Sequence, residues 1–341
     1  GCSLPAHRPW DRKIVLVADP VDPHAPKDAF DRRIDRPSKD TVDELRTALD
    51  MCCGEVIVLS DLTTFTAEVS RYSQSLVFPY WFGQISRSRH GLLPAICEAN
   101  DLMFVGADAF VKVVCNDKEL SKAVCRQVGL DTPASILLQT IEELEHLRGV
   151  SLPVVVKPNY EGTSLGITQR NLCRSWQEVS QVAEIILRQL GQPVIVEEFI
   201  SGREFSACLL GNGAGVVELQ IGSWKIEGKS DYLDHQINSF EFKLPNDLEF
   251  ELEMVTSQFD EAVIEAMRRC FRSLGKVELL RIDGRQNETG VFIIELTPDI
   301  YLGSDGEYCQ ALKKPTAAYS DMIGSIIANS LEGYQAQVPM S

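Results

Sequence analysis

Several kinds of feature are missing from this 341-residue sequence. No apolar run approaches the ~20 residues that a membrane-spanning helix requires. The first residues, Gly1 to Arg8, lack the apolar core of a signal peptide. Basic residues are in the minority, with 33 Lys and Arg against 49 Asp and Glu, which gives a formal net charge of -16. This balance argues against nucleic acid or an anionic membrane surface as a partner. We expect a globular protein of two or three domains whose partners are small molecules.

Metal-binding and redox patterns are missing as well. The ten cysteines are scattered, mostly among apolar neighbours, and no Cys-x-x-Cys pair occurs. The five histidines are dispersed, and no zinc spacing or Ser-His-Asp arrangement can be recognised. We therefore predict buried, reduced thiols and a cytoplasmic location.

The two common glycine-rich nucleotide motifs, Gly-x-x-x-x-Gly-Lys-Ser/Thr and Gly-x-Gly-x-x-Gly, do not occur either. What the chain has instead is a short β-branched run from Val154 to Val156, which predicts a core strand. Lys157 stands at the end of this strand, and Pro158 stops its ladder of hydrogen bonds. A cation placed there can meet a phosphate.

A loop rich in glycine and hydroxyl residues, Tyr160 to Gly166, follows that lysine and is called the glycine loop. Gly162 and Gly166 permit backbone N–H groups to turn toward an anion, while Thr163 and Ser164 add hydroxyl donors. Together with Lys157, the loop favours an anion-binding flap for a nucleotide triphosphate. An ordinary hairpin with a surface lysine is the alternative.

The first hundred residues predict a parallel sheet. Strands are predicted at 13–18, 56–59 and 75–78, and helices at 41–51 and 91–99. Strands that alternate with helices indicate an α/β domain of Rossmann-like type over residues 1–103, carrying substrate and not dinucleotide. The proline-rich stretch from Asp19 to Asp40 is far longer than the usual connection of about 2 to 6 residues. It is expected to be a lid or to be disordered.

The remaining chain divides into two parts by its predicted elements. Residues 104–190 form a small α+β unit, with helices at 116–129 and 141–147 and strands at 135–138 and 154–158; residues 191–341 contain a helix at 257–274 and strands at 279–283 and 291–296. A hairpin-type loop from Gly284 to Gly290 joins the last two strands. The hairpin would place Asp283 and Glu295 side by side.

These two acids predict a metal site. With Arg281 two residues before the first of them, Mg²⁺ could bridge phosphate oxygens while the guanidinium meets developing negative charge. The alternative is a surface carboxylate pair with a structural arginine.

Four spaced blocks together resemble the ATP-grasp superfamily, and most closely its D-alanine-D-alanine ligase branch. The blocks are the Asp-Lys helix at 117–118, the stretch at 154–169, Glu-Glu-Phe-Ile at 197–200 with Gly-Arg-Glu at 202–204, and Arg-Ile-Asp at 281–283 with Ile-Ile-Glu at 293–295. The resemblance runs from about residue 104 to 332. It implies an N-terminal α/β domain followed by a two-part ATP-grasp domain.

The resemblance also implies roles for individual residues. Lys118 and Lys157 would reach nucleotide phosphates, Glu197 and the backbone of Ile200 would face adenine, and Glu204 would take the ribose hydroxyls. Glu161, Thr163 and Ser164 would cover the phosphates. Asp283 and Glu295 would bind two Mg²⁺ ions, a site that also suits Mn²⁺, with Arg281 and Ser164 as the catalytic residues.

The sequence departs from the family at several of these positions. Thr297 stands where the family has a metal-binding asparagine, and Asp299 is an alternative ligand. His235 stands where a lysine reaches the terminal phosphate, with Lys225 and Lys229 as possible substitutes.

The substrate end departs as well. The acidic residues that hold the first D-alanine have no counterpart, and the equivalent regions read Arg36-Pro-Ser38 and Trp81 to Gly91. Arg36, Arg87 and Arg89 would face a carboxylate-rich substrate or lie at the solvated surface. Ser304 is a further predicted substrate contact.

The combined prediction is an ATP-dependent carboxylate-amine ligase that forms an amide or peptide-like bond through an acyl phosphate. Its substrates would be small carboxylates and amines, with the glycine loop closing over the intermediate. The alternatives are a true D-alanine-D-alanine ligase, an ATP-binding regulatory protein that has lost catalysis, and a carboxylate kinase. The resemblance also implies a homodimer.

Overall fold

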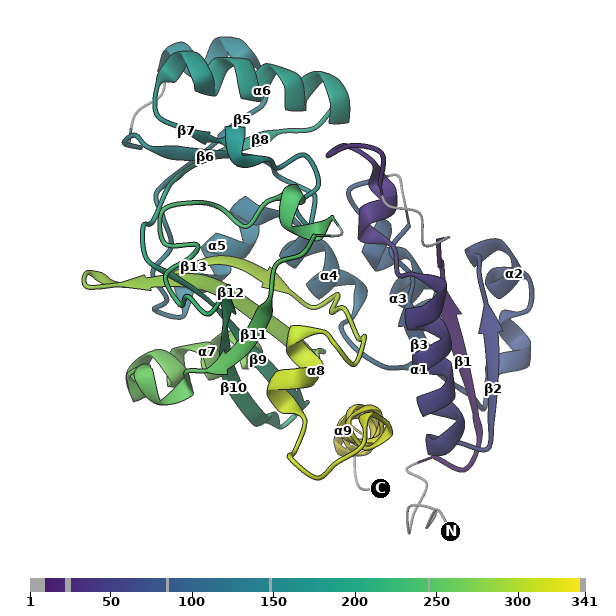
Figure 1. The fold of residues 1–341 in the computed structure, drawn as a ribbon. Coiled ribbons are helices and arrows are strands. Elements are labelled where there is room, and N and C mark those ends of the chain that lie inside the picture. The colour runs from purple at the N-terminus through teal and green to yellow at the C-terminus, as the bar shows by residue number, and fades with distance from the viewer. Residues whose placement is uncertain (1–9, 22–25, 84–85, 147–148, 245, 338–341) are drawn as a thin grey trace.

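The computed structural model describes residues 10–21, 26–83, 86–146, 149–244 and 246–337, and these form three sheets with helices around them (Figure 1). The predicted mixed α/β and α+β class is confirmed. The predictions for the first eight residues, for 22–25 within the long loop and for 84–85 lie outside the described residues.

The N-terminal sheet is parallel, in the order β2-β1-β3-β4. Its strands are β1 (Lys13–Ala18), β2 (Glu55–Leu59), β3 (Leu76–Tyr80) and β4 (Met103–Phe104), and its helices are α1 (Lys39–Cys52), α2 (Leu62–Ala67) and α3 (Arg89–Ala99). Ser38 caps α1 by accepting the N–H of Thr41. Five of the six residues of β1 are buried, which explains its unbroken apolar sequence.

The second sheet is antiparallel, in the order β5-β8-β6-β7, and α6 (Trp176–Leu190) covers its outer face (Figure 1). Its strands are β5 (Ser135–Leu138), β6 (Val154–Pro158), β7 (Leu172–Cys173) and β8 (Val194–Glu198). Ser175 and Glu178 form a capping box at the start of α6, and Gly191 ends the helix at a φ of 61°. Two helices, α4 (Ala109–Asn116) and α5 (Lys118–Gln127), precede this sheet.

The third sheet is also antiparallel, in the order β11-β10-β9-β12-β13. It consists of β9 (Arg203–Asn212), β10 (Gly215–Ile226), β11 (Phe250–Met254), β12 (Leu279–Asn287) and β13 (Gly290–Thr297), with α7 (Glu261–Leu274) packed on it. The chain then forms α8 (Glu307–Leu312) and α9 (Tyr319–Gln337).

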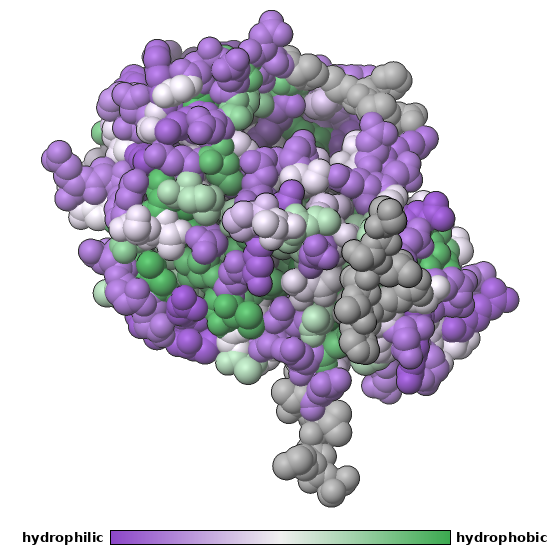
Figure 2. Space-filling model, turned by 60° about the horizontal axis from the view of Figure 1, so that its bottom comes forward, coloured by the Kyte–Doolittle hydropathy of each residue, from purple (hydrophilic) through white to green (hydrophobic). Residues whose placement is uncertain are grey.

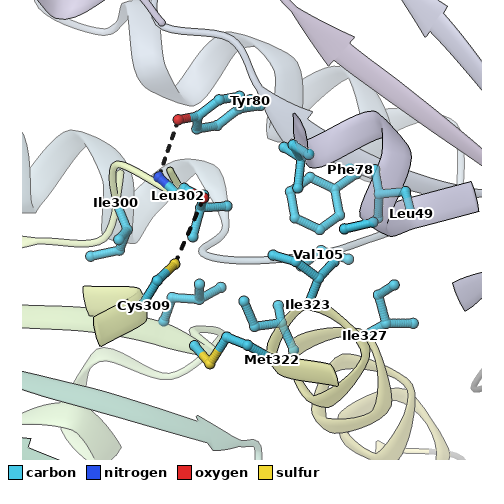
Figure 3. Packing of buried hydrophobic residues seen from close by; sticks show 14 of the residues in the cluster. Leu49, Phe78, Tyr80, Val105, Ile300, Leu302, Cys309, Met322, Ile323 and Ile327 are labelled. Carbon is cyan, nitrogen blue, oxygen red and sulfur yellow. Dashed lines mark hydrogen bonds between the residues drawn. The ribbon is translucent and has the colours of Figure 1, made fainter. Parts of the chain in front are cut away.

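The C-terminal helices share a core with the N-terminal sheet. Leu49 of α1 and Phe78 of β3 belong to one buried cluster with Ile323 and Ile327 of α9 (Figure 3). The Leu302 N–H donates to the Tyr80 hydroxyl at 3.2 Å. The two ends of the chain are therefore packed together. The domain boundaries 1–103, 104–190 and 191–341 remain a prediction.

Most predicted elements are confirmed within a few residues, but three differ. The predicted loop Gly284 to Gly290 is mostly strand, and only Glu288 and Thr289 form the turn between β12 and β13. The helix predicted at 257–274 begins at Glu261, after a 3-10 turn, and the one predicted at 141–147 is 3-10 over Ile141–His146.

The surface and interior match the composition. The face drawn in Figure 2 is largely hydrophilic, with apolar side chains in small separate patches. All nine cysteines in the described ranges are buried, as predicted. No helix among the described residues is long and apolar enough to cross a membrane.

Candidate active site

A cavity lies between the second and third sheets, with the glycine loop and the segment 230–243 completing its wall. It brings together most of the residues predicted from the sequence. These are Lys118, Lys157, Glu161, Thr163, Ser164, Glu197, Ile200, Glu204, Arg281, Asp283 and Glu295. The elements that supply them are far apart in sequence and converge only in the fold.

One end of the cavity is built around a buried cluster of charges. The Lys157 Nζ donates to Glu197 Oε1 at 2.8 Å, and Lys122 forms an ion pair with Glu197 Oε2. All three residues are almost fully buried. Burial lowers the pKa of Lys157, with the attraction of Glu197 acting in the opposite direction. Although burial opposes ionisation of Glu197, the two lysines lower its pKa below the ordinary value.

Lys118 connects this cluster to the third sheet. Its Nζ donates to Glu295 Oε1 at 3.0 Å and also to the backbone oxygen of Glu161. The position of Lys118 is fixed in two ways. Asp117 caps α5, and the backbone N–H of Lys118 donates to the Asn159 oxygen at 3.1 Å. Burial disfavours the charged form of Glu295, but Lys118 holds its pKa below the ordinary value.

The opposite wall is the paired end of β12 and β13. Asp283 lies directly opposite Glu295 in this ladder, as predicted, and both side chains therefore share one face. The register shifts between Asp283 and Gly284, which is a bulge beside the site. A Cβ on Gly284 would lie 2.5 Å from the Phe292 oxygen, so that close approach requires glycine.

Arg281 is already engaged on this wall. Its guanidinium makes a bidentate pair with Asp283, with Nε to Oδ1 at 2.8 Å and Nη2 to Oδ2 at 2.8 Å. The Ser206 hydroxyl donates to Asp283 Oδ1 at 2.7 Å. Burial alone would disfavour the guanidinium charge, but Asp283 and Glu307 raise the pKa of Arg281 above its ordinary value.

The glycine loop is anchored on both sides. Thr163 Oγ1 donates to Asp35 Oδ1 at 2.7 Å, and the Ser164 hydroxyl donates to the Asn238 oxygen at 3.1 Å. Thr163 and Ser164 adopt φ values of 51° and 59°, in the left-handed region that a β-branched residue rarely occupies. The loop is therefore held against the mouth of the cavity by specific contacts.

Glu161 turns away from the position predicted for it. Its backbone lines the cavity, but its carboxylate accepts from Arg32 Nη1 at 2.9 Å, Arg89 Nη2 at 2.8 Å and Gln192 Nε2 at 2.7 Å. The side chain thus joins the glycine loop to the N-terminal part of the chain.

The strand end at Glu198 to Ile200 borders the cavity together with Glu204. Glu204 accepts from Arg285 Nη2 at 3.0 Å and from Asn238 Nδ2 at 3.1 Å. Arg285 is buried and also donates to the Leu233 oxygen at 3.0 Å, which ties the 230–243 segment to the third sheet.

Other predicted residues are not brought to the cavity. Thr297 lies opposite Arg281 in the strand ladder but is not part of the lining, and Ser304 is exposed, with its N–H donating to Glu44. Asp299 is buried in ion pairs with His90 and Lys112. It is held away from the predicted metal position.

The arginines and the histidine also lie elsewhere. Arg89 is buried against Asp35 and Glu161, so it is neither a surface residue nor a free substrate contact. Arg36 pairs with Asp19. Arg87 is exposed and lies over the Tyr160 ring at 5.8 Å.

The candidate replacements for the phosphate lysine lie outside the lining. His235 is exposed and bonds to the Ser201 hydroxyl at 3.0 Å. Lys225 pairs with Glu253, and Lys229 is exposed.

Sequence reasoning missed four charged residues at or beside the cavity. Lys122 could have been found, because it lies one turn after Lys118 on the same helix face. Lys243, Arg285 and Glu307 line the cavity, and no local pattern marks them. Among the described residues, the Lys243 side chain makes no ion pair; burial lowers its pKa, and Glu204 and Glu307 act in the opposite direction.

The donor set suits a magnesium nucleotide. Carboxylate oxygens from two facing strands are the ligands that Mg²⁺ prefers, and two lysines from separate elements suit a polyphosphate. In the part of the chain that is described, no three His, Cys, Asp or Glu side chains are gathered closely enough to hold a metal by themselves. A metal would therefore depend on phosphate oxygens to complete its ligands.

The chain is similar in sequence to known proteins. The family model described as D-ala D-ala ligase C-terminus matches residues 124–328. A D-alanine–D-alanine ligase from Carboxydothermus hydrogenoformans is 27% identical over 259 residues, covering 72% of this chain and 78% of that protein. An uncharacterized protein, y4sG, from Sinorhizobium fredii is 26% identical over 287 residues and 81% of each chain.

A solved structure shows the same fold. The D-alanine–D-alanine ligase from Bacillus anthracis complexed with ATP superposes with a TM-score of 0.70 at 16% identity, covering 96% of this chain and 100% of that one. The family model covers more than half of the sequence. The chain therefore belongs to the D-Ala-D-Ala ligase C-terminal domain family, as an ATP-grasp protein of the D-Ala-D-Ala ligase-like type.

Proposed function

We propose that this protein is an ATP-dependent carboxylate-amine ligase. The observation that carries the proposal is the opposition of two walls in one cavity. Lys118 and Lys157 line one side, and Arg281, Asp283 and Glu295 line the other. Relatives named as D-alanine–D-alanine ligases and a structural neighbour described as an ATP complex support it.

The adenine is assigned to the strand end at Glu197 to Ile200 and the ribose to Glu204. The phosphates would then lie beside Lys157 and Lys118, whose positive charges reduce the repulsion between the phosphate groups. We also assign Lys243 to the terminal phosphate. It lines the cavity without an acidic partner in the described ranges, whereas His235 lies outside.

The chemistry has two steps. A substrate carboxylate oxygen attacks the terminal phosphorus of ATP, the bond to the bridging oxygen breaks, and an acyl phosphate and ADP result. The amine nitrogen then attacks the acyl carbon, inorganic phosphate leaves, and the amine gives up a proton. Arg281 stands where negative charge develops on the acyl oxygen.

Magnesium, held by Asp283 and Glu295 with Thr297 as a weaker third candidate, would supply charge neutralisation between the phosphates. The glycine loop would exclude water from the acyl phosphate, because hydrolysis there wastes the intermediate. Its two hydroxyl contacts connect it to Asp35 and to Asn238.

The test is phosphate release from Mg·ATP with a panel of D- and L-amino acids and small dicarboxylates, followed by mass spectrometry of the products. We expect release that requires one carboxylate and one amine, with a product whose mass equals their sum less one water. Adding hydroxylamine should trap the acyl phosphate as a hydroxamate.

The rival functions give different results in the same assay. Release with D-alanine alone would identify a D-alanine-D-alanine ligase, and hydroxamate without an amide product would identify a carboxylate kinase. Tight ATP binding without release on any member of the panel would contradict the ligase and favour a regulatory ATP-binding protein.

A further inference from the structure

One acidic residue in the cavity, Glu307, forms no ion pair with any of the described residues. Glu307 is the first residue of α8 and lines the cavity on the side of Arg281 and Asp283. Its position is set by the helix behind it. The Tyr308 hydroxyl donates to the Leu209 oxygen at 2.7 Å, and Leu312 belongs to the buried core. The backbone of Glu307 is therefore held in place at the wall of the cavity.

The other carboxylates of the cavity are all satisfied within the protein. Five form ion pairs: Glu161 with Arg32 and Arg89, Glu197 with Lys122 and Lys157, Glu204 with Arg285, Asp283 with Arg281, and Glu295 with Lys118. Glu198 accepts the Ser151 N–H at 2.7 Å. Within the described ranges, Glu307 has no cation in ion-pair range.

The surroundings of Glu307 make its isolation costly. Its neighbour Ser206 has a single hydroxyl hydrogen and donates it to Asp283, so this hydroxyl does not satisfy Glu307 as well. Burial, together with the nearby charges of Asp283 and Glu204, raises the pKa of Glu307 to about 7, although Arg281 acts against this shift. A carboxylate so placed gains more from a ligand cation than one that is already paired.

The beginning of a helix favours an acidic residue, and this is the simpler explanation for Glu307. It is insufficient here. The helix has only six residues. An acidic side chain at its start would stabilise it equally well if that side chain pointed into solvent, but Glu307 instead lines a cavity among other acids.

We propose that Glu307 binds a positively charged group, an ammonium or a guanidinium, on the amine substrate. The inference rests on the proposed ligase function and adds the class of acceptor, which is an amine that carries a second, cationic group. Lys243 lies in the same cavity and makes no ion pair among the described residues, although Glu307 is one of the carboxylates that raise its pKa against the effect of burial.

The test compares cationic amines with neutral ones of the same shape: lysine with norleucine, ornithine with norvaline, and arginine with citrulline, as D- and L-forms. Wild type, Glu307→Gln and Glu307→Leu are measured, with Glu288→Gln in the exposed hairpin turn as the matched control. Two readouts are used, namely kcat/KM for amide formation and the Kd of each amine by calorimetry with Mg·ADP present.

We expect wild type to prefer the cationic member of at least one pair by about 10- to 100-fold, the size of a charge-assisted hydrogen bond. Glu307→Gln should remove this preference, while Glu288→Gln keeps it. The KM for ATP and the Mg²⁺ concentration needed for half-maximal activity should stay unchanged in Glu307→Gln.

Calorimetry separates the two proposals. If no amide forms but cationic amines still bind wild type more tightly than Glu307→Gln, the ligase function fails and the role of Glu307 stands. Equal binding of cationic and neutral amines to wild type overturns the role of Glu307, whatever the activity. A changed Mg²⁺ requirement in Glu307→Gln also overturns it, because the carboxylate would then be a metal ligand.

Discussion

The two ends of the cavity hold their charges in different ways. At the lysine end, Lys122, Lys157 and Glu197 are buried and neutralise one another. At the opposite end, the side chains of Asp283 and Glu295 are 18% and 27% exposed. The first end is complete in the protein alone, and the second remains partly open to solvent.

This difference separates stability from specificity. A buried, mutually neutralised cluster fixes the geometry in which a nucleotide is received, but it tolerates little change, because each lost partner leaves a buried charge. A partly exposed wall costs less to alter, and solvent access lets metal, phosphate or substrate add to its charge pairs. Substitutions at the two ends should therefore affect different measurements.

The largest effect on folding is expected for Glu197→Ala. Removing this carboxylate leaves Lys157 and Lys122 buried side by side without compensation, at a cost of about 3 to 5 kcal/mol in the free energy of unfolding. Asp283→Asn, on the partly exposed wall, should cost less than Glu197→Ala, because solvent reaches both Asp283 and its partner Arg281. Urea denaturation of both variants measures the contrast, and equal losses would contradict it.

The largest effect on turnover is expected for Glu295→Gln. The change keeps the shape but removes the charge that pairs with Lys118 and faces Asp283 across the strands. We expect kcat to fall by about 100- to 1,000-fold, with a smaller loss of stability than in Glu197→Ala, because the amide oxygen can still accept a hydrogen bond from Lys118 and Lys118 keeps its bond to the Glu161 oxygen. Glu288→Gln, in the turn of the same hairpin, is the control. A Glu295→Gln variant with wild-type turnover would show that Asp283 and Glu295 are wrongly assigned as the metal ligands.

A smaller effect is expected where the glycine loop meets the N-terminal part of the chain. In Glu161→Gln, Arg89 keeps its pair with Asp35 at 3.2 Å, so no buried charge is left alone. The loss should be about 1 kcal/mol, seen as faster amide hydrogen exchange in residues 160–166 and a several-fold higher KM for ATP. Unchanged exchange would mean that the hydroxyl contacts of Thr163 and Ser164 hold the loop alone.

The predictions that the structure confirms concern short segments with strong local signals. The β-branched run at 154–156 forms a central strand, and the periodicity of two in β12 and β13 puts Asp283 opposite Glu295. Lys157 and the glycine loop follow at fixed spacing, so the sequence located them at the cavity.

Predictions that depended on packing between distant segments fared differently. Arg89, predicted to face substrate or solvent, is buried because Asp35 and Glu161 reach it from separate segments. The carboxylate of Glu161 turns toward the same arginine instead of the phosphates. Thr297, two residues after Glu295 on the same strand, and Ser304, in the segment that follows, are not among the residues that line the cavity.

By itself, the sequence determined the identity and order of the elements, together with the site residues that lie at strand ends or in one loop, because backbone periodicity acts over a few residues. Only the tertiary structure decided which charges neutralise one another and which remain for a ligand. Lys243 and Glu307 belong to no local pattern, and their roles depend on the low dielectric and the distances of one cavity to which separate elements contribute.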